Sequence, residues 1–165
     1  MPSVGITEAV MADELPAITA WADRSGWAVM YDPVALKGRA EVWHPKQRHT
    51  KVLFWFDVEG YPDRQPPAWW CGGEGLVVSK ESQNYPRPPA TPPPGPPNGS
   101  VFHPNPVICA PWNRLAYSAN GGPHGDWASL AAWKTNGVEY TQAHTIPDML
   151  ATLNLHLDRS DGMQG

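Results

Sequence analysis

Two cysteines are the residues of this chain best suited to covalent chemistry, and Cys109 is the stronger candidate. A thiolate is nucleophilic near neutral pH and leaves readily, so it can accept an acyl group as a thioester and pass it to an amine. Cys109 follows the tripeptide His-Pro-Asn at 103–105, in a loop bracketed by prolines. This placement favours a nucleophile, and the alternative is a buried structural cysteine, the commoner fate of a free thiol.

Asn105 and His103 are the residues just before Cys109 that could assist an acyl transfer. The side-chain amide of Asn105 can donate a hydrogen bond to the oxyanion of a tetrahedral intermediate, or it can brace the loop that does so. The alternative is a turn residue that caps its own loop. We expect His103 to order the loop through hydrogen bonds rather than to act as a base.

A polar, glycine-rich stretch supplies further candidates, which are Asn113, Tyr117, Asn120, His124 and Asp126. A lysine nucleophile must lose a proton before it attacks, and His124 or Asp126 could desolvate it, orient it or accept that proton. The alternative is a surface loop in which Asp126 caps a short helix at 127–133. The sequence shows no compact catalytic triad, and thioester exchange needs none because it is close to isoenergetic.

For the second cysteine we predict a structural role, and for the histidines we predict no metal site. Cys71 continues the apolar run Trp69-Trp70, so we predict that it packs in the core or at a sheet edge and serves as an internal control for Cys109. A zinc site would have to combine His103, Cys109, His124 and His144. Their spacing matches no compact ligand motif, so we predict neither a metal nor another cofactor.

A helix and several strands are predicted ahead of the cysteine loop. The helix runs from near Asp13 to Gly26, and Leu15, Ile18, Trp21 and Ala22 share its apolar face. We expect 1–12 to be an N-terminal tail, with an extra helical turn as the alternative. Alternating patterns predict strands at 27–32, 39–44 and 50–58, joined by turns as an antiparallel meander. The apolar residues at 68–70 continue the sheet after a proline-rich turn.

The strand at 50–58 has the strongest pattern. Its inner face carries Val52, Phe54, Phe56 and Val58. Leu53 and Trp55 lie on the opposite face, which we expect the proline-rich segment to cover; docking of a modifier or partner is the alternative. The last helix is predicted from Ile146 to near Arg159, with Thr145 as its cap. Its apolar stripe comprises Ile146, Met149, Leu150, Leu153 and Leu157.

The prolines are unevenly distributed along the chain, since eight of the 20 lie between Pro86 and Pro97. Such a segment cannot form a helix or a central strand, so we interpret about 80–100 as a stiff insertion. The sequence therefore predicts a single α+β domain at 13–159 that contains this insertion, with helices segregated from one sheet. Tails are expected at 1–12 and 160–165.

Composition excludes several classes of protein. Nine tryptophans argue against a chain that is disordered throughout. The net charge of −4 provides no general nucleic-acid-binding surface. No apolar run approaches the ~20 residues of a membrane span, and no signal peptide is recognised. We therefore predict no membrane association and a cytoplasmic location.

The order of these features resembles the ubiquitin-conjugating enzyme family. Shared features are the helix and meander, the turn Tyr-Pro-Asp-Arg-Gln-Pro-Pro at 61–67, the tripeptide at 103–105 with Cys109 after it, and a last helix that opens with Thr145-Ile146. The resemblance covers about residues 13–157 and implies the ubiquitin-conjugating fold with a four-stranded antiparallel meander. Cys109 lies only four residues after Asn105 and is followed by Ala-Pro-Trp, departures that look more like the divergent bacterial members.

The resemblance implies a transferase that accepts the C-terminus of a ubiquitin-like modifier from an activating enzyme as a thioester on Cys109, then passes it to an amine of a protein substrate. In the bacterial systems a deconjugating peptidase often belongs to the same pathway, and several such systems are linked to antiphage defence. Because of the short interval between Asn105 and Cys109, a non-catalytic scaffold that binds an activating enzyme or modifier is the alternative. An unrelated metal-dependent hydrolase is a distant third.

Overall fold

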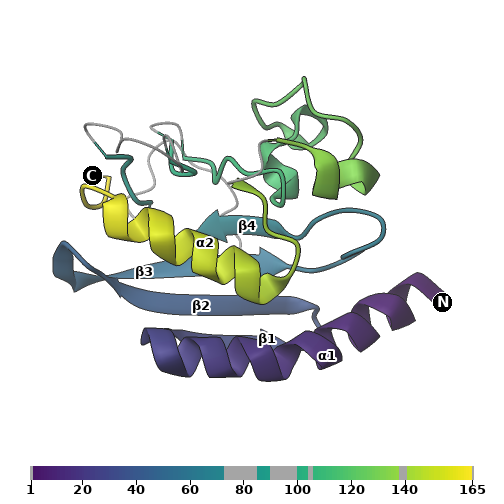
Figure 1. Ribbon diagram of the computed structural model, residues 1–165, viewed down its shortest axis with the longest axis horizontal. Helices are drawn as coiled ribbons and strands as arrows, with labels where there is room; N and C mark the ends of the chain where they lie inside the picture. Colours follow the sequence, from purple (N-terminus) through teal and green to yellow (C-terminus); the bar gives the residue numbers. More distant parts are fainter. Residues whose placement is uncertain (1, 73–84, 90–99, 104–105, 138–140, 165) are drawn as a thin grey trace.

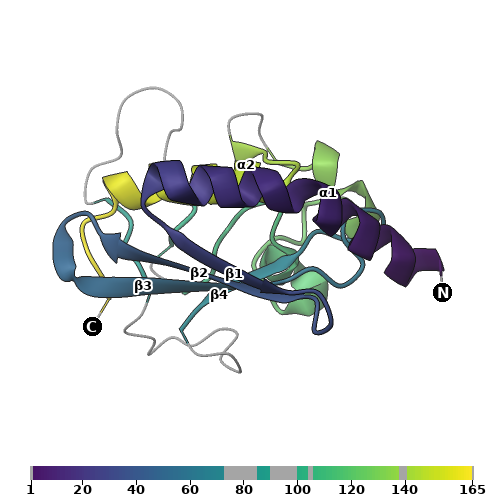
Figure 2. The ribbon, with the colours of Figure 1, turned by 90° about the horizontal axis from the view of Figure 1, so that it is seen from below.

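The computed structural model describes residues 2–72, 85–89, 100–103, 106–137 and 141–164, and it shows the expected α+β fold. A four-stranded antiparallel sheet carries two α-helices on one of its faces (Figures 1 and 2). Along the described chain the order is a helix, four strands, short 3-10 helices and a final helix. This order is consistent with the topology of ubiquitin-conjugating enzymes.

The sheet is a meander of β1 (Ala28–Asp32), β2 (Lys37–His44), β3 (Gln47–Asp57) and β4 (Ala68–Cys71), paired in chain order. The first three strands lie close to the positions that the alternating pattern predicts, and β4 coincides with the apolar run expected to continue the sheet. Antiparallel neighbours can be joined by short turns, which is why consecutive strands pair here. The register places Phe54 opposite Cys71 and Phe56 opposite Trp69, so large apolar side chains from β3 and β4 lie together.

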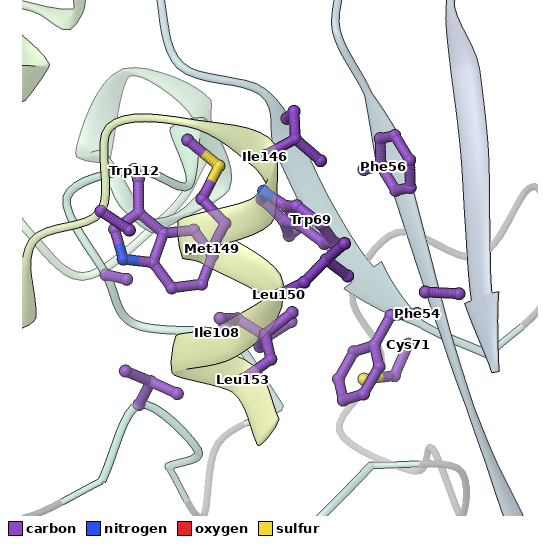
Figure 3. Packing of buried hydrophobic residues seen from close by; sticks show 14 of the residues in the cluster. Phe54, Phe56, Trp69, Cys71, Ile108, Trp112, Ile146, Met149, Leu150 and Leu153 are labelled. Atoms are coloured by element: carbon purple, nitrogen blue, oxygen red, sulfur yellow. The ribbon is translucent and has the colours of Figure 1, made fainter. Parts of the chain in front are cut away.

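The core lies between the sheet and the final helix, α2 (Ile146–Arg159). The inner face of β3 is fully buried, as predicted, and the apolar stripe of α2 packs over it. Figure 3 shows Phe54 and Trp69 on the sheet facing Leu150 and Leu153 on the helix. The predicted cap is also present, because the Thr145 side chain accepts a hydrogen bond from the Asp148 backbone amide at 3.3 Å.

The first helix is longer than predicted. α1 spans Pro2–Ser25, so the expected start near Asp13 is wrong and residues 2–12 are not a tail. Thr7 and Met11 continue the buried face of Ile18, and the Thr7 hydroxyl donates to the Tyr61 carbonyl at 2.6 Å. A polar threonine satisfied by a distant backbone group leaves no apolar signal in the sequence. Leu15, which the pattern places on the same apolar face as Ile18, is 39% exposed.

Glu14 joins the two helices to the turn that follows β3. Its carboxylate accepts hydrogen bonds from the Tyr61 hydroxyl and from the Ile146 backbone amide, both at 2.6 Å. The second contact places a negative charge at the N-terminus of α2, where the helix dipole favours it. Burial raises the pKa of Glu14, and the two hydrogen bonds oppose that rise.

The C-terminal segment belongs to the domain rather than forming the expected tail at 160–165. Pro86 forms a β-bridge with Met163, and the Gln164 amide donates to the Tyr85 carbonyl at 2.8 Å. Ser160 is fully buried and hydrogen-bonds the His44 ring at 3.0 Å. The start of the proline-rich segment is therefore held against the end of the chain by pairing over a long sequence separation.

Other predictions have mixed outcomes. The short helix expected at 127–133 is instead a 3-10 helix at Leu130–Thr135, and two further 3-10 turns lie at Arg114–Ala116 and Ser118–Asn120.

Leu53 and Trp55 are half-buried on the outer face of β3. Most of the proposed cover, the insertion at about 80–100, lies outside the described residues, so that point stays a prediction. Within the described part of the chain, neither α-helix is long and apolar enough to cross a membrane.

Candidate functional site

Cys109 lies at the end of a short paired segment beside β4. Phe102 and Ile108 form an antiparallel β-bridge, and the Cys109 amide donates to the Val101 carbonyl at 2.8 Å. These contacts fix the Cys109 backbone while its side chain remains partly accessible. Pro104 and Asn105 lie outside the described residues, so the role expected for Asn105 stays a prediction.

Asn113 holds this segment against the sheet. Its side-chain oxygen accepts a hydrogen bond from the Trp69 amide at 2.9 Å, and its nitrogen donates to the carbonyls of Trp69 at 3.1 Å and Ile108 at 2.8 Å. The side chain is fully buried, and its carboxamide satisfies backbone groups that β4 leaves unpaired. Asn113 therefore positions the cysteine segment and is not available to a substrate.

The glycine-rich loop brings His124 back to this segment. The His124 amide donates to the Ala116 carbonyl at 3.0 Å, and the Ser118 amide donates to the His124 carbonyl at 3.1 Å. Gly122 sits so close to the chain that a Cβ there would meet the Ala116 backbone at 2.2 Å. Gly121 has φ of +85°, a conformation that suits glycine. The two glycines permit a turn tight enough to return His124 beside Cys109.

Three of the predicted site residues form one contiguous arrangement. The Cys109 Sγ lies 2.8 Å from the His124 Nε2, and the His124 Nδ1 lies 3.0 Å from the Asp126 Oδ1. A carboxylate can only accept a hydrogen bond, so we assign the proton of the neutral ring to Nδ1. Nε2 is then free to accept the thiol proton. The expectation that the chain has no compact triad is wrong, because the loop closes a gap of 15 residues.

Burial governs the electrostatics of the three groups. It raises the pKa of the Cys109 thiol to about 11, and the negative charge of Asp126 adds to the effect. The hydrogen bond from His124 holds the pKa of Asp126 below its usual value. At neutral pH the site thus pairs a protonated thiol with an ionised carboxylate, and the imidazole between them must act as the base that forms the thiolate.

Trp127 is the residue that the sequence interpretation missed. Its ring stacks on the His124 ring with 3.6 Å between centroids and 1° between planes, and it meets Tyr117 edge-on at 5.0 Å. The stack fixes the plane of the imidazole, which directs one nitrogen to Cys109 and the other to Asp126. A tryptophan directly after the run His-Gly-Asp at 124–126 was the available signal, but that tryptophan was assigned to a helix.

His103 directly follows Phe102, which forms the β-bridge with Ile108 ahead of Cys109. Burial lowers the pKa of His103, and the neighbouring His124 lowers it further, so it is neutral at pH 7. Its backbone amide donates to the Tyr85 hydroxyl at 3.2 Å. This contact is made by the backbone, so the ordering role expected for the His103 side chain stays a prediction. Tyr85 is itself buried, and its hydroxyl donates to the Val107 carbonyl.

Cys71 differs from Cys109 in burial and in its surroundings. It is buried on β4, beside the ring of Phe54 in Figure 3. Burial raises the pKa of its thiol further than that of Cys109, so it has little thiolate character. Both cysteines are free thiols. The prediction of core packing for Cys71 is confirmed.

Of the four residues considered for zinc, Cys109 and His124 are in contact, but His144 has other partners. His144 hydrogen-bonds the Lys134 carbonyl at 3.1 Å and packs edge-on against Trp133 near the start of α2. Across the described ranges, no group of three or more histidine, cysteine, aspartate or glutamate side chains could hold a metal ion.

A thiol, an imidazole and a carboxylate in this order can perform acyl transfer, because the ring can take the thiol proton while the carboxylate holds its tautomer. Comparison of this chain with protein-family models, curated proteins and solved structures found no match.

Proposed function

We propose that this protein is an acyl transferase of the ubiquitin-conjugating type. In this proposal Cys109 accepts the C-terminal glycine of a ubiquitin-like modifier from an activating enzyme and passes it to an amine of a protein substrate. The proposed setting is the bacterial cytoplasm, in a modification pathway linked to antiphage defence and supplied with a deconjugating peptidase. The order of helices and strands supports the likeness to ubiquitin-conjugating enzymes by analogy of fold.

The observation that carries the proposal is the 2.8 Å contact between the Cys109 Sγ and the His124 Nε2. Of the two thiols only Cys109 combines partial exposure with a base, whereas Cys71 is buried. A non-catalytic scaffold would not require a base at its cysteine. The contact therefore favours a carrier over the scaffold that the short interval after Asn105 suggested.

The chemistry follows from the geometry. His124 removes the thiol proton as Cys109 attacks the carbonyl carbon of the donor thioester, and the donor thiolate leaves with a proton from the imidazole. An exchange between two thioesters has little driving force of its own, so the direction depends on which partner departs. The amine of the substrate then attacks the new thioester and releases Cys109.

The test uses a donor that needs no activating enzyme. A short polypeptide ending in Gly-Gly as a C-terminal alkyl thioester is incubated with the chain, and the product is resolved on a non-reducing gel and by mass spectrometry. We expect a thiol-sensitive adduct on Cys109 that is lost in Cys109→Ala and kept in Cys71→Ser. The absence of an adduct, with this donor and with a cognate activating enzyme, modifier and ATP, would support the scaffold instead.

A further inference from the structure

We propose that this site delivers its acyl group to oxygen nucleophiles, water or a hydroxyl group, in addition to amines. The inference rests on the proposed function, because it concerns the fate of the thioester formed on Cys109. It is carried by the alignment of Cys109, His124 and Asp126, with separations of 2.8 Å and 3.0 Å.

The need for a base distinguishes the two kinds of acceptor. A neutral amine is a good nucleophile and can lose its proton after it has attacked. A hydroxyl group or water is a poor nucleophile unless a base removes its proton during the attack. Forming the thiolate needs the base once, during loading, whereas attack by an amine on the loaded thioester does not need it a second time. Here the imidazole is oriented twice, by Asp126 and by the stacked ring of Trp127.

The imidazole of His124 becomes available to an incoming nucleophile once Cys109 is acylated. In the resting site the His124 Nε2 is occupied by the Cys109 thiol. Once the sulfur is acylated it carries no proton, so Nε2 loses that partner. An incoming oxygen that approaches the carbonyl carbon next to the sulfur then lies within hydrogen-bonding reach of this nitrogen.

Discharge proceeds in two balanced steps. The oxygen attacks the acyl carbon, an O–C bond forms, and the oxygen's proton moves to the His124 Nε2. The C–S bond then breaks, and the Cys109 thiolate recovers that proton from the imidazolium. The products are a free acid when water attacks, or an ester when an alcohol attacks, and the thiol and neutral ring are regenerated. No oxidant, reductant or further co-reactant takes part.

Asp126 is a positioning residue in this scheme. It touches His124 but not the reacting atoms, and its side chain is 76% exposed. Solvent screening weakens an exposed contact of this kind, so we expect Asp126→Asn to slow discharge by about tenfold rather than abolish it. Because the carboxylate also fixes the tautomer, the same variant should move the pH dependence of discharge, which a merely structural role would not do.

The experiment loads Cys109 with the Gly-Gly thioester donor, removes excess donor, and follows loss of the acyl group by mass spectrometry in buffer, in 1 M glycerol and in hydroxylamine. An acylated cysteine peptide is the uncatalysed reference. We expect the folded chain to discharge to water and glycerol about 100-fold faster than the peptide, with a glyceryl ester as product. His124→Gln should lose this acceleration yet still react with hydroxylamine, and Cys71→Ser should match the unaltered chain.

Each outcome has one meaning. Loading followed by discharge to water and glycerol at the rate of the peptide would overturn the inference and leave the proposed function intact. Discharge to oxygen that persists in His124→Gln would also overturn it. Acylation by p-nitrophenyl acetate with the same His124-dependent discharge, but no loading from the Gly-Gly donor, would support the oxygen chemistry and reject the modifier role. No acylation of Cys109 by either donor rejects both.

Discussion

Acidification should destabilise this protein through His156, whose ring is buried on the inner side of α2. Its Nδ1 accepts a hydrogen bond from the Val101 backbone amide at 3.3 Å. Its Nε2 has no hydrogen-bond partner among the described residues. Burial, with a smaller contribution from the charge of Arg159, lowers the pKa of His156 to about 4.

The size of the effect follows from the gap between the folded and unfolded pKa values. An unfolded histidine titrates near 6.5, so folding lowers the pKa of His156 by about 2.5 units, equivalent to about 3 kcal/mol. Between these two values the unfolded chain binds the extra proton and the folded chain does not. The stability contribution is therefore complete above about pH 6.5, falls as the pH falls, and is lost by about pH 4.

The assay is urea unfolding followed by tryptophan fluorescence at intervals from pH 7.5 to pH 4, on the unaltered chain and on His156→Asn. Asparagine keeps an acceptor near the Val101 amide but does not titrate. We expect the free energy of unfolding to fall by about 3 kcal/mol less in the variant over this range. Burial also lowers the pKa of His44, and that residue is present in both chains, so its effect cancels in the difference.

His49, exposed on β3, supplies the matched control. His49→Asn should keep the pH profile of the unaltered chain. Parallel profiles for the unaltered chain and His156→Asn would refute the reasoning, because they would mean that protonation of His156 is not linked to unfolding. The contact between His156 and Val101 also supports the candidate site, because the Val101 carbonyl accepts the hydrogen bond from the Cys109 amide.

Three further predictions concern the supports of the site. Asn113→Ala should lower the free energy of unfolding by about 3 kcal/mol, measured by urea unfolding, because buried backbone groups of β4 and the cysteine segment lose their partner. Trp127→Leu should slow alkylation of Cys109 by iodoacetamide several-fold with a smaller change in stability, because the imidazole loses its stacked ring; an unchanged rate would show that the stack does not orient the base. Gly122→Ala should reduce the same rate by about tenfold or more, since its Cβ would displace the loop, whereas Gly125→Ala, with no contact closer than 3.7 Å, should behave as the unaltered chain.

The elements of regular structure were predictable because their signals are local. Alternation of apolar residues along β3 and the stripe along α2 reflect which side of each element faces the core, and both are confirmed. The apolar pattern of α1 is weaker, and it did not predict the first half of this helix. There the buried side chain of Thr7 is satisfied by the Tyr61 carbonyl, a partner 54 residues away that no local window contains.

The sequence by itself determined an α+β chain with a meander sheet, a capped final helix and a candidate nucleophilic cysteine ahead of a polar stretch. Only the tertiary structure decided that Cys109, His124 and Asp126 align as thiol, base and orienting carboxylate. That alignment depends on a loop whose return is set by backbone hydrogen bonds, by the lack of space at Gly122, and by a stacked Trp127. Candidate residues could be chosen by type, but distances of about 3 Å between them arise from packing, which the periodicity of a sequence does not encode.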